Sequence, residues 1–310
     1  MKLTWTLAAL AALGSSANAD DMNPAAGEAV QVLGVASSAR GAAADYLVLP
    51  EGGELTGQMK FITADASLGG KPLEFTDLAM FGVTGRWSLF RKLELGANVD
   101  LLPKQPSYLD EKTWQSVGFT LRSPFGQHAA IALSGSGGHL LDSAGMWTRE
   151  ALAIEWKKPI DREWVAFDIQ GGIEGTGLVR DTDSAFLTEL ALQTSVMFRE
   201  PSSHWGGWVG IGYARPVQHS GVDPTTEMAI DPQPRVDFHA GTVLAISHEW
   251  DLFTSFAVID RGDLANPATR LPILDGGFDQ KQIVFGVTRH IDPPRHAHPA
   301  PADRDDVMPL

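Results

Sequence analysis

Most of this sequence alternates between apolar and polar or small side chains with a period of two, the period of a strand with two different faces. In 164–174, for example, Val165, Phe167 and Ile169 share one face, whereas Asp168 lies on the other. After the first nineteen residues no apolar stretch approaches the ~18 residues that a membrane-spanning helix needs. If the chain enters a membrane, it does so as a closed barrel, because only helices and closed barrels satisfy their backbone hydrogen bonds in lipid.

Twelve segments show this alternation, and each is close to the ~9–11 residues of a tilted membrane strand. They are 54–64, 78–89, 93–101, 114–123, 128–136, 147–157, 164–174, 186–198, 205–215, 234–248, 251–260 and 280–290. Short links alternate strictly with longer ones, and the longer links are 65–77, 102–113, 137–146, 175–185, 216–233 and 261–279. An up-and-down barrel with both chain ends in the periplasm has this arrangement. The predicted fold is therefore all-β: a closed antiparallel up-and-down transmembrane β-barrel of about twelve strands.

The two ends of the chain differ from this barrel region, 54–291. Residues 1–19 have the order of a cleavable signal peptide: a positive Lys2, an apolar run and an A-x-A cleavage site at 17–19. We therefore expect export to the cell outer membrane. Residues 20–53 form an N-terminal periplasmic segment or linker, with a short helix or a plug in the lumen as alternatives. The tail 292–310 is rich in proline and charge, which is typical of disorder.

Composition excludes several functions. Without Lys2 the chain has 23 basic and 38 acidic residues, a formal charge of −15, which argues against nucleic acid as a partner. The absence of cysteine excludes disulfides, thiolate metal sites and a lipid-modified cysteine. The expected partners are outer-membrane lipid, the barrel-assembly machinery and small solutes.

Charged residues on the polar face of the strands are the candidate functional residues. A basic residue facing lipid at mid-bilayer costs roughly 2–4 kcal/mol, so the alternation assigns these residues to the lumen. They form either a channel wall that selects among solutes or a network of ion pairs that fills a narrow barrel. The candidates are Lys60, Arg86, Glu94, Asp100, Arg122, Arg149, Glu155, Asp168, Glu174, Glu189, Asp237 and His239.

Aromatic residues beside the short links fall in the outward register of their strands. An aromatic girdle at the periplasmic interface of a membrane barrel has this placement. The alternative is that these rings close the core of a soluble barrel, and Trp164 departs from the pattern because it falls in the inward register. The predicted girdle consists of Trp87, Phe125, Trp156, Phe198, Trp205 and Trp250.

In this architecture the chain resembles porin-like outer-membrane β-barrel proteins of Gram-negative bacteria, over residues 54–291. The resemblance implies a cylindrical barrel, assembly from the periplasm and passage of small solutes. One departure is the end of the last strand. Such barrels usually finish on an aromatic residue, whereas this strand runs on through 289–291 into the tail.

Motifs for enzyme chemistry are absent from the sequence: it has no G-x-S-x-G elbow, no phosphate-binding loop and no H-E-x-x-H motif. A Ser–His–Asp arrangement at the rim cannot be judged from spacing. Asp181 and Asp183 are too few for calcium, and the histidines of the tail are weak metal ligands. We therefore predict no catalytic residue, no metal and no cofactor. The favoured function is a passive channel for small solutes; the alternatives are a non-conducting structural or adhesive barrel, a rim-located hydrolase and a soluble periplasmic β-sandwich.

Overall fold

The computed structural model describes residue 49 and residues 52–68, 71–89, 93–101, 114–125, 128–139, 145–161, 165–180, 184–199, 204–220, 234–247, 249–261 and 278–291. Twelve antiparallel strands form one closed barrel, which confirms the predicted fold class. The strands are β1 (Gly53–Leu68), β2 (Lys71–Leu89), β3 (Leu93–Leu101), β4 (Trp114–Pro124), β5 (Ala129–His139), β6 (Gly145–Asp161), β7 (Val165–Arg180), β8 (Ser184–Arg199), β9 (Trp205–Ser220), β10 (Arg235–Ala245), β11 (Trp250–Arg261) and β12 (Phe278–Ile291).

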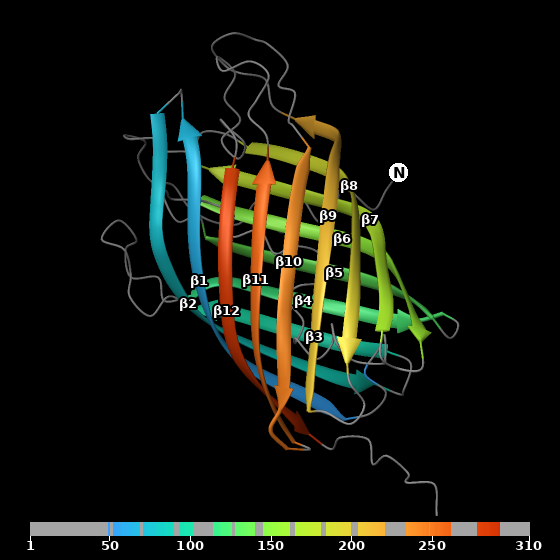
Figure 1. The fold of residues 1–310 in the computed structure, drawn as a ribbon. Helices are drawn as coiled ribbons and strands as arrows, with labels where there is room; N and C mark the ends of the chain where they lie inside the picture. Colours follow the sequence, from blue (N-terminus) through green and yellow to red (C-terminus); the bar gives the residue numbers. More distant parts are fainter. Residues whose placement is uncertain are drawn as a thin grey trace, which may run out of the picture.

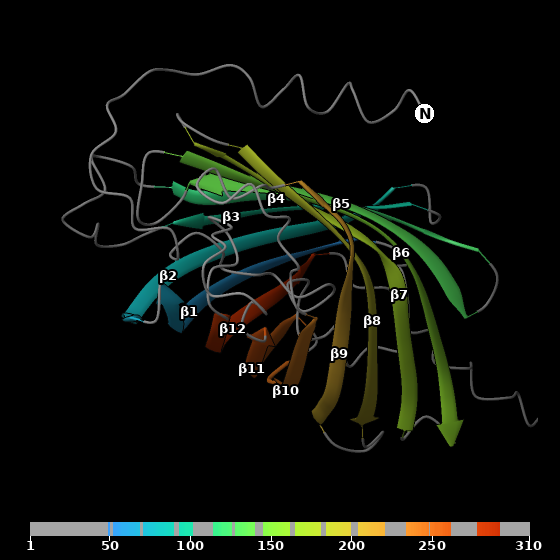
Figure 2. The same cartoon turned by 90° about the horizontal axis from the view of Figure 1, so that it is seen from above.

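Each strand pairs with its neighbours in the sequence, and the first strand closes the barrel against the last. The closing pair runs from Gly53 opposite Ile291 to Ala66 opposite Phe278. Figures 1 and 2 show the strands following one another around the barrel in chain order. Closure leaves none of the twelve strands with an unpaired edge, which is the condition for placing a sheet in lipid.

At the end of the barrel that carries the chain ends, the strands begin and end close to the predicted positions. At the opposite end, several strands are longer than predicted. The prediction of a long link at 65–77 was wrong, because β1 continues to Leu68 and β2 begins at Lys71. The link 175–185 is likewise reduced to 181–183. A shift of register between Ile62 and Ala64 accompanies the extension of the first hairpin. Such a shift breaks the alternation on which the sequence analysis depends.

The outer face of the barrel is apolar. Large side chains on this face are exposed on every strand, among them Phe81, Leu152, Ile211 and Phe285, which are 43–56% exposed. No helix in the described part of the chain is long and apolar enough to cross a membrane. The reason for the pattern is the pleat: successive side chains point to opposite faces, so each apolar residue outside has a polar or small neighbour inside.

One part of the inner face is apolar as well. Met197, Trp208, Val243, Phe253 and Val284 form a buried cluster on strands β8 to β12. It lies toward the end of the barrel that carries the chain ends and the links 90–92, 125–128, 162–164, 200–204 and 246–249, here called the short-link end. The inner wall therefore has an apolar cluster toward the short-link end of the C-terminal strands, while most of its buried charged side chains lie elsewhere on the wall.

Candidate functional site: the barrel lumen

The structure places the twelve predicted lumen residues in the inner register of their strands. Asp168 is half-buried, and the other eleven are buried with exposed fractions of 1–7%. Charges that are removed from water at this depth need partners, because an isolated buried charge costs several kcal/mol. The lumen is therefore best described by its ion pairs.

The first group of charges lies at the short-link end, where Arg86 on β2 joins carboxylates from both neighbouring strands. Its guanidinium donates to Glu94 from Nε and Nη2 at 2.8 Å each, and Nη1 lies 3.1 Å from Glu54. His290 on β12 lies 3.3 Å from Glu54 and 2.8 Å from Asp251. Three carboxylates thus surround one arginine and one histidine, and a bidentate contact fixes the arginine.

The chain that precedes β1 enters this group from inside the barrel. The backbone of Gly52 has a φ of 76°, in the left-handed region that favours glycine. On the far side of this turn Leu49 is only 3% exposed, and its N–H donates to Glu94 Oε2 at 2.8 Å. Leu49 therefore lies at the short-link end of the lumen, in contact with Glu94.

Further along the barrel, ion pairs reach across an intervening strand. Lys60 on β1 lies 2.7 Å from Asp100 on β3, and Ser116 Oγ donates to the same carboxylate at 3.0 Å. Between the two strands lies Gly82 of β2, where an added Cβ would come within 2.7 Å of Asp100. The pair can form across the strand because glycine leaves the space empty.

Ion pairs also reach across intervening strands between β4 and β10. Arg122 on β4 lies 2.5 Å from Glu155 on β6, across the alanines of β5. Arg235 on β10 reaches Glu174 on β7 at 3.3 Å and Glu189 on β8 at 3.7 Å. Glu174 also pairs with Arg149 on β6. Charge pairs therefore tie together strands that are not hydrogen-bonded to one another.

A smaller polar cluster lies on β8 and β10. His239 Nε2 is 2.9 Å from Ser195 Oγ and 3.1 Å from Gln193 Nε2, and His239 Nδ1 is 3.6 Å from Asp237 Oδ1. Asp237 Oδ1 and Gln193 Oε1 are buried without a hydrogen-bond partner. The alternation in the sequence predicts that Asp237 and His239 face inward, whereas their contacts with β8 depend on the stagger between the strands.

Sequence reasoning missed five buried charged residues that share these networks: Glu54, Lys157, Arg235, Asp251 and His290. Each lies in the inward register, so extending the alternation to the strand ends would have found them. The segment ends had been treated as less regular than they are.

The six predicted girdle residues lie in the outward register at the short-link end. Five are exposed, and Phe198 is half-buried because its ring packs against Trp205 at a centroid distance of 5.3 Å. Arg289 lies over the ring of Trp250 at 5.6 Å. Trp164 lies outside the described residues.

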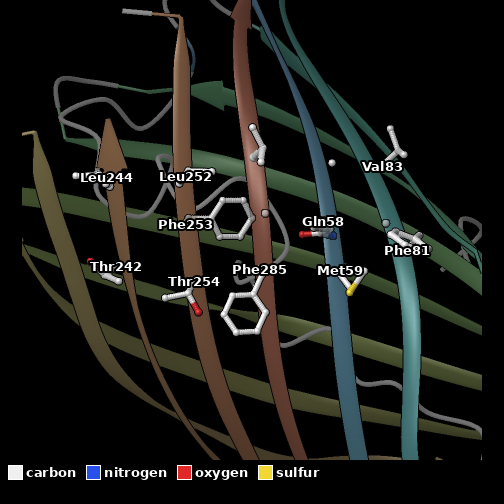
Figure 3. Close-up of a pocket in the computed structure, with 14 residues that line it drawn as sticks. Gln58, Met59, Phe81, Val83, Thr242, Leu244, Leu252, Phe253, Thr254 and Phe285 are labelled. Atoms are coloured by element: carbon white, nitrogen blue, oxygen red, sulfur yellow. The ribbon is translucent and has the colours of Figure 1, made fainter. Parts of the chain in front are cut away.

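The outer wall carries a shallow apolar groove across β2, β1, β12, β11 and β10 (Figure 3). Gly57 contributes no side chain there, and Phe81, Phe285, Leu244 and Leu252 border the groove. Its lining is almost wholly apolar, so it offers contact to hydrocarbon and no chemistry of its own.

Within the described strands, no three His, Asp, Glu or Cys side chains are gathered closely enough to hold a metal ion. The loop residues Asp181 and Asp183 lie outside the described residues, and so do the histidines of the tail 292–310. His290, just before the tail, is described and lies in β12. The predicted segments 1–19 and 292–310 lie outside them as well.

The sequence matches no protein-family model and no curated protein. Among solved structures the barrel is similar to the translocator domain of the autotransporter NalP from Neisseria meningitidis, with 10% identity over 77% of this chain and 88% of that one, and a TM-score of 0.49. An outer-membrane channel from Pseudomonas putida F1 is 11% identical over 80% of this chain and 98% of its own, with a TM-score of 0.49. The NanC porin is 6% identical over 74% and 98%, with a TM-score of 0.43. These similarities concern the architecture of porin-like outer-membrane barrels.

Proposed function

We propose that this protein is an outer-membrane β-barrel that serves as a passive channel for small solutes. The observation that carries the proposal is the division of the strands into two faces. The outer face presents exposed apolar side chains all around a closed barrel, and the inner face carries charged and polar ones. This is the arrangement that lipid outside and water inside require.

The charges of the lumen support a preference for cations. Among the buried side chains of the described strands, eight carboxylates lie with six lysines and arginines. Rings and clusters of acidic residues favour the entry of cations over anions. The full chain carries a formal charge of −14, which has the same sign as this excess.

A non-conducting structural barrel is the second candidate, and one observation favours it. The ion pairs leave Glu54, Glu94, Glu174 and Glu189 only 1% exposed, so a water-sized probe barely reaches them. Twelve strands lie between the filled eight-stranded barrels and the open sixteen-stranded ones, so pore size does not follow from the strand number.

Conductance of the refolded protein in a planar bilayer tests the proposal. We expect stable single-channel steps with cation preference, and a lower preference in Glu189→Gln. The matched control is Glu150→Gln, which removes the same charge from an exposed position on the outer face of β6. A barrel that is folded by its heat-modifiable gel mobility but passes no current would contradict the channel and favour the filled barrel.

A further inference from the structure

We propose that Ser195 is an activated nucleophile inside the lumen, with His239 as its general base and Asp237 as the carboxylate whose charge stabilises the histidine when it is protonated. The carrying observation is the contact of 2.9 Å between Ser195 Oγ and His239 Nε2, with Asp237 Oδ1 3.6 Å from His239 Nδ1. A nucleophile, a base and a carboxylate in this order are the parts of a Ser–His–Asp triad. This inference is independent of whether the barrel conducts.

The cluster depends on two glycines of β9. Ser195, Gly210 and His239 lie in one row across three strands, and Gln193, Gly212 and Asp237 lie in the next. A Cβ at Gly210 would come within 2.3 Å of His239 Nε2 and 2.5 Å of Ser195 Oγ, and a Cβ at Gly212 within 2.2 Å of Asp237. With no side chain on β9, the residues of β8 and β10 meet directly.

The two ionisable residues of this cluster are buried as deeply as the other lumen charges. His239 and Asp237 are 2% and 3% exposed, and Asp237 Oδ1 accepts no hydrogen bond. At 3.6 Å the carboxylate makes no hydrogen bond to Nδ1, which lies 3.3 Å from Gln193 Nε2, but its charge would stabilise the imidazolium that forms when Nε2 takes a proton. Paired carboxylates such as Glu94 are instead held by arginine.

The reaction that this geometry supports is acyl transfer from a small ester to Ser195. Ser195 Oγ would attack the carbonyl carbon as its proton passes to His239 Nε2, and the alcohol would leave with that proton. Water would then attack the acyl-serine and give a proton to the same nitrogen. As the bond between the acyl carbon and Oγ breaks, His239 would pass that proton to Ser195 Oγ, which releases the acid and restores both the serine and the neutral histidine. The amide of Gln193, whose Nε2 lies 3.1 Å from His239 Nε2, is the side-chain donor that we assign to the developing oxyanion.

The neighbouring side chains define the substrate class. Met197 and Trp208 occupy the next inward positions toward the short-link end, and both belong to the apolar inner cluster. A short acyl chain would lie against them, whereas the charged walls favour water and small polar leaving groups. The predicted substrates are short-chain carboxylic esters that are small enough to enter the lumen.

The test uses the full refolded protein, a fluorophosphonate probe with peptide mass spectrometry, and hydrolysis of p-nitrophenyl acetate. We expect a covalent adduct on Ser195 and ester turnover, both of which are lost in Ser195→Ala. The matched control is Ser255→Ala, because Ser255 is also a buried inward serine but has no histidine among its described contacts. Turnover that persists unchanged in Ser195→Ala would overturn the proposal, as would a folded wild-type barrel that forms no adduct.

A second variant tests whether the reaction requires the contact between Ser195 and His239, and not only the presence of the two side chains. Gly210→Ala keeps every functional group but forces His239 and Ser195 apart, so the rate is expected to fall about a hundredfold, the lower range for loss of a general base. Gly175→Ala is the control, since a Cβ at Gly175 meets nothing within 4 Å. A Gly210→Ala barrel that is folded and fully active would refute the assignment of His239. If Gly210→Ala does not fold, the comparison of Ser195→Ala with Ser255→Ala still tests the proposal.

Discussion

Replacing Arg86 by methionine tests whether Arg86 and its two carboxylates are shielded from water. The guanidinium is 2% exposed and contacts Glu94 at 2.8 Å and Glu54 at 3.1 Å. Methionine has a similar length but no charge, so Arg86→Met leaves these two carboxylates with their largest positive neighbour removed. The free energy of unfolding is expected to fall by about 3–5 kcal/mol, the usual cost of breaking a buried pair from one side.

The magnitude follows from the distances. At 2.8 Å and an effective dielectric constant of about 20, one contact is worth roughly 6 kcal/mol before desolvation, whereas in bulk water it is worth about 1.5 kcal/mol. Desolvation of the guanidinium and the two carboxylates offsets part of the larger figure. Water in contact with Arg86 and its two carboxylates would therefore lower the loss to about 1 kcal/mol.

The assay is reversible denaturant unfolding in lipid vesicles, followed by tryptophan fluorescence. Adding Glu54→Gln and Glu94→Gln to Arg86→Met should recover most of the lost stability, because the uncompensated charges are gone. Arg215→Met is the control, since it removes an arginine that is exposed on the outer register of β9. A loss below about 1 kcal/mol, or a triple variant less stable than the single one, would refute the shielding of this group of charges from water.

The remaining predictions concern the two faces of the wall. Leu152→Arg should cost roughly 2–4 kcal/mol of unfolding free energy in lipid vesicles, and Val217→Arg, near the outer end of its strand, about 1 kcal/mol or less; equal costs would argue against a bilayer around the barrel. Gly172→Ala should lower the denaturation midpoint, at a cost of about 1–3 kcal/mol, because its Cβ would lie 2.3 Å from the carbonyl oxygen of Leu152. Gly175→Ala has open space and should be neutral or slightly stabilising. Trp250→Ala should weaken vesicle binding of the folded protein more than Trp250→Phe does, since the indole anchors the interface; equal binding would contradict the girdle.

The number of strands and the face on which each side chain lies could be predicted, because both follow from the two-residue alternation of the sequence. The alternation places Leu95 outward and Glu94 inward, and β3 begins and ends where it predicts. It fails where the pattern is interrupted, as in 65–77, where Pro72 lacks the N–H of a strand residue and the register shifts nearby.

Partners across the lumen could not be predicted, because they depend on the stagger between strands. Arg122 and Glu155 are 33 residues apart, and Ser195 and His239 are 44 apart. The alternation determines that such residues face inward but not the height at which each one lies. The glycine at 210 was a usable signal, since a strand glycine often marks a close approach, but it did not reveal what approached.

The apolar cluster inside β8 to β12 also bears on the order in which the barrel folds. Its five members lie on consecutive strands, so the C-terminal part of the chain can bury them before β1 meets β12. The contact between His290 and Glu54 forms only when β12 meets β1, and closing so long a stretch of chain has the largest entropic cost. Pulsed hydrogen exchange during refolding should therefore protect the amides of β9 to β11 before those of β1 and β2, and the seam between the first and last strands should form as the final event.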